Sequence, residues 1–221
     1  RQGTQFVRFS IREDFLEYRR MDENGDPASY TDPLTGETVD AITAFRSHLK
    51  QKSVNDQEVI LEFNTVRSNF GDTFFSNRRW NEKIKWISVK INADAQVSDV
   101  MVELEQSGTA FVRNAAQGIP DPDHPDRLVG EMTGYPVWYW YLDNAGDWAS
   151  KDSFGFGINA VVNDDKNAPA ESYQKREFHE MSPAVTKWVL KVPLENSMGW
   201  KILDVDKISD IEIWFYNYYH A

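Results

Sequence analysis

The chain has 221 residues, with 24 Lys and Arg against 35 Asp and Glu, a formal net charge of −11, and no cysteine. This acidic balance argues against a protein that binds the phosphate backbone of nucleic acids, and against electrostatic binding to membrane surfaces. The lack of cysteine excludes disulfides, Cys-ligated zinc, iron–sulfur clusters and thiol nucleophiles.

The N-terminal part of the chain is predicted to contain a strand, a helix and a second strand. Over 5–11, apolar residues dominate every second position, as in a half-buried strand. Apolar residues at helical spacing over 39–49, following Thr38 as a candidate N-cap, predict the helix. A run rich in Val, Ile, Leu and Phe over 58–63 predicts the next strand.

The remainder of the chain is predicted to be strands. Alternation is clear over 83–91 and 97–104, and the short gap between these two segments predicts a hairpin. Further strands are predicted over 153–162, 186–192 and 208–216, each beginning or ending near residues that favour turns. The pattern predicts many short strands and a single helix.

These elements predict a mainly β fold, an antiparallel two-sheet sandwich or jelly-roll-like arrangement with one short peripheral helix. No shift in composition marks an internal boundary, so residues 1–221 are predicted to be a single β-sandwich domain. The chain begins at Arg1 with neither Met nor a signal peptide, which indicates a processed protein or a fragment of a larger protein. No apolar run approaches the ~18 residues of a membrane-spanning helix.

One loop carries the residue types of a calcium site. Asp121, Asp123, His124 and Asp126 place four oxygen or nitrogen ligands close together in the chain. Three prolines stiffen the same loop, and a solvated loop without an ion remains the alternative reading. The histidines of the chain are scattered without paired spacing, which argues against a zinc site. Apart from Ca²⁺ at Asp121, Asp123 and Asp126, no cofactor is predicted.

The sequence contains no recognisable catalytic pattern. There is no G-x-S-x-G motif and no glycine-rich loop that would hold a phosphate. Carboxylates are abundant because the chain is acidic, and none of them forms a pair that we can nominate as a glycosidase acid and base. We therefore expect a protein that is not an enzyme.

Aromatic residues are the most prominent feature, at 14% of the chain with 8 Trp. The runs 138–141 and 214–219 put rings at successive positions, and successive side chains of a strand point to opposite faces. The outward rings are either covered by loops, or form a protein interface, or stack on sugars. The candidate contact residues are Trp138, Trp140, Trp148, Trp214 and Tyr216.

Two further residues are predicted to be structural. Asp210 is interpreted as a hydrogen-bond acceptor for backbone groups or for Ser209, just ahead of the last strand. Trp188, in an alternating strand, is interpreted as a large core side chain.

Four segments resemble the C-terminal region of the A components of Tc toxins, a family of large insecticidal toxins. The segments are Arg79–Ile91, Val100–Leu104, Lys175–Pro193 and Asp204–Ile213, in the same order as in the family. Residues 1–70 lie outside the resemblance.

The resemblance implies a β-sandwich without catalytic residues that docks a protein partner within a secreted, toxin-like bacterial assembly. It implies an extracellular location, and oligomers formed through regions outside this chain. The alternative is a carbohydrate-binding module that presents an aromatic platform to a glycan. Neither nucleic acid nor a membrane span is expected.

Overall fold

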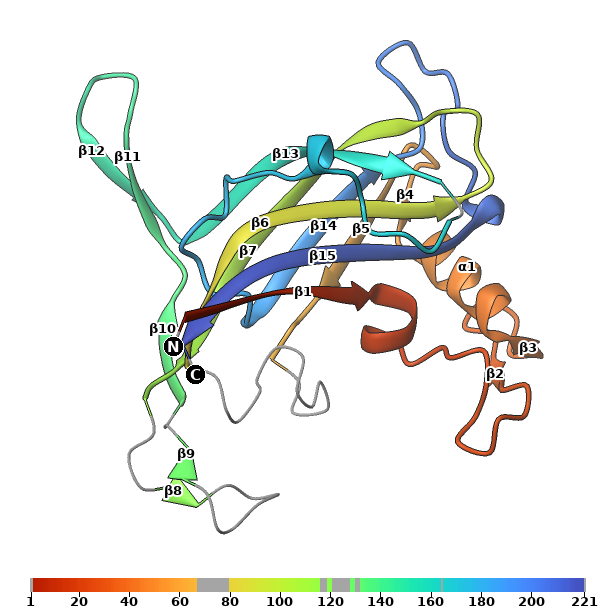
Figure 1. Cartoon of the computed structure of the whole chain (residues 1–221). Helices are drawn as coiled ribbons and strands as arrows, with labels where there is room; N and C mark the ends of the chain where they lie inside the picture. Colours follow the sequence, from red (N-terminus) through yellow and green to blue (C-terminus); the bar gives the residue numbers. More distant parts are fainter. Residues whose placement is uncertain are drawn as a thin grey trace.

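The fold was analysed in a computed structural model that describes residues 2–66, 80–115, 119–120, 128–129, 132–163 and 165–220. The described chain is mainly β and contains one α-helix, as predicted (Figure 1). No helix within these ranges is both long enough and apolar enough to cross a bilayer.

The first elements in the chain are β1 (Gln2–Ser10), the short π-helical turn η1 (Ile11–Phe15), β2 (Ser29–Thr31), β3 (Thr38–Asp40), α1 (Ala41–Gln51), β4 (Ser53–Val54) and β5 (Glu58–Phe63). The central part contains β6 (Trp80–Ala93), β7 (Asp99–Arg113), β8 (Ile119–Pro120), β9 (Leu128–Val129), β10 (Met132–Pro136), β11 (Tyr139–Leu142) and β12 (Trp148–Lys151). The last elements are β13 (Ser153–Val162), η3 (Glu171–Tyr173), β14 (Val185–Pro193), η4 (Val205–Lys207) and β15 (Ile208–His220).

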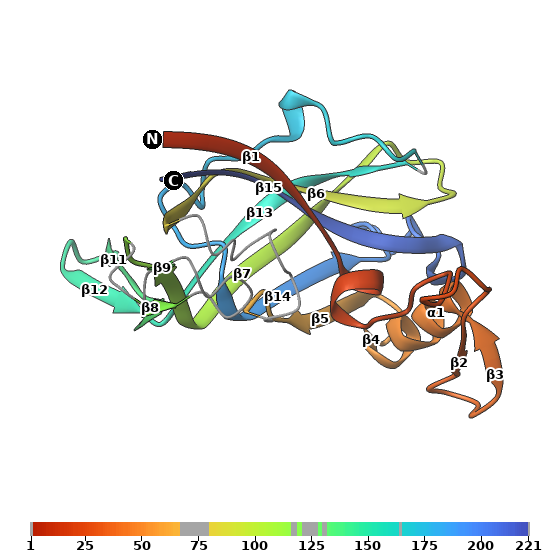
Figure 2. The ribbon, with the colours of Figure 1, turned by 60° about the horizontal axis from the view of Figure 1, so that its bottom comes forward.

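The main strands are hydrogen-bonded in the order β1-β15-β6-β13-β7-β14-β5-β4, and β10 adds to β7. Figures 1 and 2 show β1, β15 and β6 in one layer and β7, β14 and β5 in the layer facing it. The two-layer prediction is confirmed. The layers are continuous through β13, which runs antiparallel to β7 and meets β6 in a short parallel pairing at Val161 and Val162. That parallel pairing departs from the predicted antiparallel arrangement.

The predicted hairpin between the segments 83–91 and 97–104 is wrong. β6 pairs with β15 and, at its end, with β13, whereas β7 pairs with β13, β14 and β10. The connection therefore carries the chain from one layer to the other. A short gap in the sequence is compatible both with a hairpin and with a crossing between layers. In the crossing, the apolar sides of both strands contribute to one core, and Val89 and Val102 are both fully buried.

The core between the layers is built on aromatic rings. Trp188 of β14 is fully buried, and its ring lies 5.8 Å from that of Phe215 on β15, 5.5 Å from Phe178 and 6.3 Å from Phe63 on β5. Its indole Nε1 donates to Thr65 Oγ1 at 3.0 Å, so the single polar atom of this side chain is satisfied. The prediction that Trp188 is a core residue is confirmed.

The single helix begins later than predicted. Asp40, not Thr38, is the N-cap of α1, because its carboxylate accepts from the backbone N–H groups of Ile42 and Thr43. The helix is peripheral, as expected, and lies at one end of the layers (Figure 1). It is held there by buried side chains such as Phe45 and by a hydrogen bond from Arg46 Nε to the carbonyl of Ile208.

Replacing Trp188 by alanine should lower the free energy of unfolding by about 3–5 kcal/mol, because a large cavity would open between the layers. Urea unfolding followed by circular dichroism would measure the loss. The matched control is Trp200→Ala, since Trp200 is 68% exposed and its removal should change stability by less than about 0.5 kcal/mol. Equal effects of the two substitutions would contradict this account of the core.

Candidate binding surface

The hairpin formed by β11 and β12 projects away from the layers (Figure 1). Its strands are antiparallel, with Trp140 opposite Ser150 and Leu142 opposite Trp148. The turn between them is closed by Asp143, whose carboxylate accepts from the backbone N–H groups of residues 145 and 147. Residues that face one another across an antiparallel pair share a face, so this geometry puts several large side chains together.

We call the resulting surface the tryptophan face. It consists of Trp138, Trp140, Leu142 and Trp148, which are 54%, 56%, 59% and 70% exposed. The rings of Trp138 and Trp140 lie 5.6 Å apart, with their planes inclined at 52°. The structure thus brings together the three hairpin tryptophans nominated from the sequence, and it adds Leu142, which sequence reasoning missed because a single leucine in an aromatic run is not distinctive.

The opposite face of the hairpin attaches it to the main sheet. The ring of Tyr139 packs edge-on against Phe154 of β13 at 4.7 Å. Within the hairpin, Lys151 Nζ of β12 lies 5.0 Å from the ring centre of Tyr141 on β11. These contacts leave the tryptophan face directed away from the sheet, because successive side chains of a strand alternate between faces.

A small cavity of about 290 Å³ lies at the base of the tryptophan face. Trp138 forms one wall, and Tyr135 of β10 and Lys83 of β6 contribute polar groups, with Lys83 Nζ 3.4 Å from the tyrosine hydroxyl. Glu180 and Ser182 line another side. The cavity is large enough for one side chain of a partner beside the exposed rings.

The other two nominated aromatics, Trp214 and Tyr216, lie elsewhere. Both are half-buried on the outer face of β15, and the ring of Tyr216 lies 4.6 Å from that of Phe6 on β1 and 5.2 Å from that of Trp86 on β6. The nominated residues therefore form two separate surfaces. The sequence did not identify Phe6 and Trp86 as surface residues. Their neighbours in the chain point into the core, and the apolar pattern of those neighbours dominates both strands.

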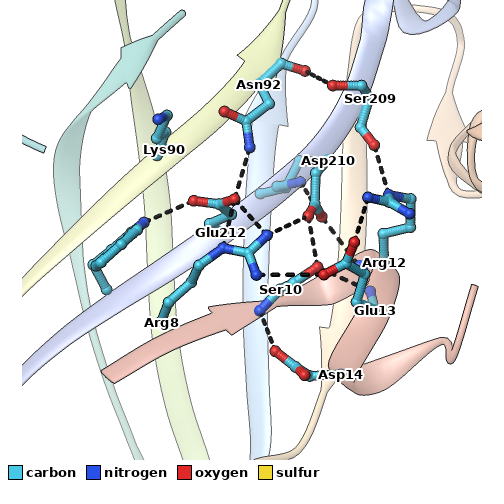
Figure 3. Close-up of polar contacts among 12 residues, drawn as sticks. Arg8, Ser10, Arg12, Glu13, Asp14, Lys90, Asn92, Ser209, Asp210 and Glu212 are labelled. Carbon is cyan, nitrogen blue, oxygen red and sulfur yellow. Dashed lines mark hydrogen bonds and ion pairs between the residues drawn. The ribbon is translucent and has the colours of Figure 1, made fainter. Parts of the chain in front are cut away.

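A buried polar cluster joins β1 and η1 to β15 (Figure 3). Asp210 accepts from Ser10 Oγ at 2.6 Å, from the backbone N–H of Arg12 at 3.2 Å and from that of Ile211 at 2.8 Å. Arg8 Nη2 lies 3.3 Å from the same carboxylate. The prediction that Asp210 accepts hydrogen bonds is confirmed for the backbone. Its hydroxyl partner is Ser10 of the neighbouring strand, brought there by pairing of β1 with β15.

Ser209 is not the partner of Asp210. Its hydroxyl donates to the backbone carbonyl of Asn92, across the pairing with β6. Ser209 lies where the pairing of β15 with β6 shifts register, and its own backbone carbonyl accepts from Arg12 Nε at 2.9 Å.

Glu212 continues the same polar cluster along β15. Its carboxylate accepts from Arg8 Nε, Asn92 Nδ2 and the indole of Trp214, each at 2.8 Å. Because these acceptors are already engaged by donors from three strands, the arrangement serves to hold the layer together (Figure 3).

Lys90 is a second buried charge with a structural environment. Its side chain is fully buried, and Nζ donates to the carboxylate of Asp165 at 2.6 Å and to the backbone carbonyls of Asp165 and Asn167 at 2.5 and 2.8 Å. The hydrogen bond from Lys90 lowers the pKa of the Asp165 carboxyl. The lysine thereby ties the segment after β13 to β6.

The predicted calcium ligands Asp121, Asp123 and Asp126 lie outside the described residues, as does His124, so the calcium site stays a prediction. Within the described ranges, no three His, Asp or Glu side chains are grouped so that they could hold a metal ion.

Comparisons with known proteins found similarity among solved structures. No family model and no curated protein sequence matches the chain. Among solved structures, the cryo-EM structure of Yersinia pseudotuberculosis TcaA-TcaB matches with 13% identity and a TM-score of 0.40, over 100% of this chain and 10% of that one. The chain therefore spans a tenth of the length of that protein. Because so low a TM-score does not establish a common fold, we base the functional proposal on the residues of this chain.

The polar cluster predicts an unusual pH dependence of stability. Burial, opposed by the hydrogen bond from Ser10, raises the pKa of Asp210 from 3.8 to about 6. The folded state therefore holds this proton more tightly than the unfolded state does. The contribution of protonated Asp210 to the free energy of unfolding is full below about pH 4 and is lost as the pH rises through about 6. The total change in the free energy of unfolding is about 3 kcal/mol. Arg8, Arg12, Glu13, Asp14 and Glu212 also face or adjoin the cluster.

Asp210→Asn should remove this part of the pH dependence, because the amide does not ionise. Urea unfolding of both proteins between about pH 4 and about pH 7 would measure the difference in slope. Asp152→Asn, which alters an exposed carboxylate, serves as the control and should leave the slope unchanged. If Asp210→Asn had the same slope as the unmodified protein, the carboxyl would not titrate in this range.

Proposed function

We propose that the chain is a non-catalytic protein-docking module of a secreted, toxin-like assembly, and that the tryptophan face is its contact surface. The observation that carries this proposal is the exposure of Trp138, Trp140, Leu142 and Trp148 on one side of a projecting hairpin. Grouped large apolar side chains in water are costly, and they mark sites that are buried on binding.

The size and composition of the tryptophan face suit a protein partner. Exposed parts of its four side chains amount to roughly 400 Å², about half of the ~800 Å² that one partner contributes to a standard interface. Tryptophan is the residue type most often found among the side chains that dominate binding energy. The cavity beside Trp138 offers space for an anchoring side chain of the partner.

The absence of catalysis is supported by how the buried carboxylates are used. Asp210 and Glu212 accept hydrogen bonds from donors on β1, β6, η1 and β15, which leaves them poorly placed to act on a substrate. These hydrogen bonds hold the strands of the layer together.

Membership of a toxin-like assembly is supported by the four segments that resemble Tc toxin A components. Their described parts include β6, part of β7, β14 with the segment before it, and η4 with the start of β15, so they contribute strands to both layers. The N-terminal segment outside the resemblance supplies β1 and β5, which flank those strands.

A carbohydrate-binding module remains the second candidate, because three tryptophans are exposed together. Sugar rings stack best on aromatic faces that lie in one plane. The 52° inclination between Trp138 and Trp140 and the aliphatic side chain of Leu142 fit an irregular protein surface better.

Replacing Trp140 and Trp148 together by alanine should weaken docking by about 100-fold or more, since each side chain would contribute about 1–2 kcal/mol or more. The partner would first be identified by capture from the secreted proteins of the host. Its affinity for the purified chain and for the double variant would then be measured by calorimetry.

The matched control is Trp200→Ala, which removes an equally exposed tryptophan from a different part of the surface. Equal weakening by Trp200→Ala, or none by the double variant, would contradict docking through the tryptophan face. Tryptophan fluorescence across a glycan panel tests the second candidate, and a saturable response lost in the double variant would favour sugar binding.

A further inference from the structure

The outer face of β6 contains a bulge that has no role in the core. Trp86 pairs with Tyr216, and Ile84 pairs with the next residue, Asn217, so Lys85 is an extra residue in the strand. Ile84 and Ile87 are fully buried, whereas Lys85 and Trp86 are half-buried. The bulge therefore places two consecutive side chains on the outer face, and bulges of this kind commonly direct side chains toward a functional surface.

These side chains form what we call the cation–aromatic patch: Phe6, Lys85, Trp86, Arg176 and Tyr216. Lys85 Nζ lies 4.9 Å from the ring centre of Trp86 and 5.2 Å from that of Tyr216. The guanidinium of Arg176 lies 5.2 Å from the ring centre of Trp86. The stack ends at Phe6, which is 51% exposed. Two cations and an exposed apolar ring thus lie next to one another.

The two cations of this patch have no acidic partner among the residues that the structure describes. Some other basic side chains do have one: Lys187 pairs with Glu62, and Lys191 pairs with Glu103. In a chain with 35 acidic residues against 24 basic ones, two cations over the same indole ring are thus left without a carboxylate within the described ranges. They provide positive charge that an external anion could use.

The net charge of −11 restricts which anion can bind. An extended polyanion, such as a sulfated glycan, a nucleic acid or an anionic membrane, would reach beyond the patch and meet the negative field of the chain within about one Debye length, ~8 Å. A short protein segment with one or two carboxylates would meet the patch alone. The exposed ring of Phe6 favours a segment in which an apolar side chain adjoins the carboxylate.

We propose that the cation–aromatic patch binds a segment of a partner protein in which a carboxylate side chain lies next to an apolar one. The carboxylate contacts Lys85 and Arg176, and the apolar side chain packs on Phe6. The patch lies on β1, β6, β15 and the segment before β14, whereas the tryptophan face lies on β11, β12 and the residue just before β11. This inference is therefore separate from the proposed docking through the tryptophan face, and each can be tested without the other.

The test is a titration of the chain with the peptide acetyl-Ala-Asp-Phe-Asp-Ala-amide, followed through the indole N–H resonance of Trp86. The peptide in which both Asp are replaced by Asn is the neutral comparison. We expect saturable shifts with the acidic peptide only. Lys85→Gln combined with Arg176→Gln should weaken binding about tenfold, since it removes two partly exposed charge contacts.

Two further variants are matched controls. Lys187→Gln with Lys191→Gln removes two cations that already have acidic partners, and Trp140→Ala with Trp148→Ala removes part of the tryptophan face. Both should bind the acidic peptide as the unmodified chain does. Equal binding of the neutral peptide, unchanged binding by the Lys85 and Arg176 double variant, or loss of binding in either control would overturn the proposal. So would a heparin fragment or phosphatidylserine vesicles shifting the Trp86 resonance where the acidic peptide does not.

Discussion

The packing of aromatic rings between the two layers is the interaction on which the rest of the structure depends. Trp188 contacts rings from the opposite layer and from the segment before its own strand, and its indole nitrogen is bonded to Thr65. A side chain of this size can be buried only if both layers are present and correctly spaced. The core therefore fixes the distance between the layers, and the layers in turn fix which residues face outward.

The continuity of the sheet has consequences for the surfaces. β13 joins the layers at one end, and its first residues carry the ring of Phe154 against which the projecting hairpin is anchored. The opposite side of the molecule is closed by pairing of β1 with β15 and by the polar cluster around Asp210. The tryptophan face and the cation–aromatic patch are thus held on separate elements of one framework, as two independent contact surfaces would need to be.

The two surfaces differ in the physical basis of recognition. The tryptophan face offers apolar area, which contributes affinity when water is removed from it. The cation–aromatic patch offers charge in an otherwise acidic protein, which contributes orientation and selectivity more than affinity. A module that docks a protein partner would benefit from both. The buried carboxylates Asp210 and Glu212 belong to neither surface, because their acceptors are occupied within the fold.

The sequence by itself determined the local structure and the candidates for contact. Strand alternation is a local property, so the strands over 58–63 and 153–162 were predicted with their observed bounds, and the burial of Trp188 followed from its alternating neighbours. Only the tertiary structure decided which strands pair, because a short connection allows both a hairpin and a crossing between layers. It also decided that the nominated aromatics separate into two surfaces, since residues far apart in the chain meet only through pairing. The bulge at Lys85 could not have been foreseen for the same reason: an extra residue exists only relative to the strand beside it.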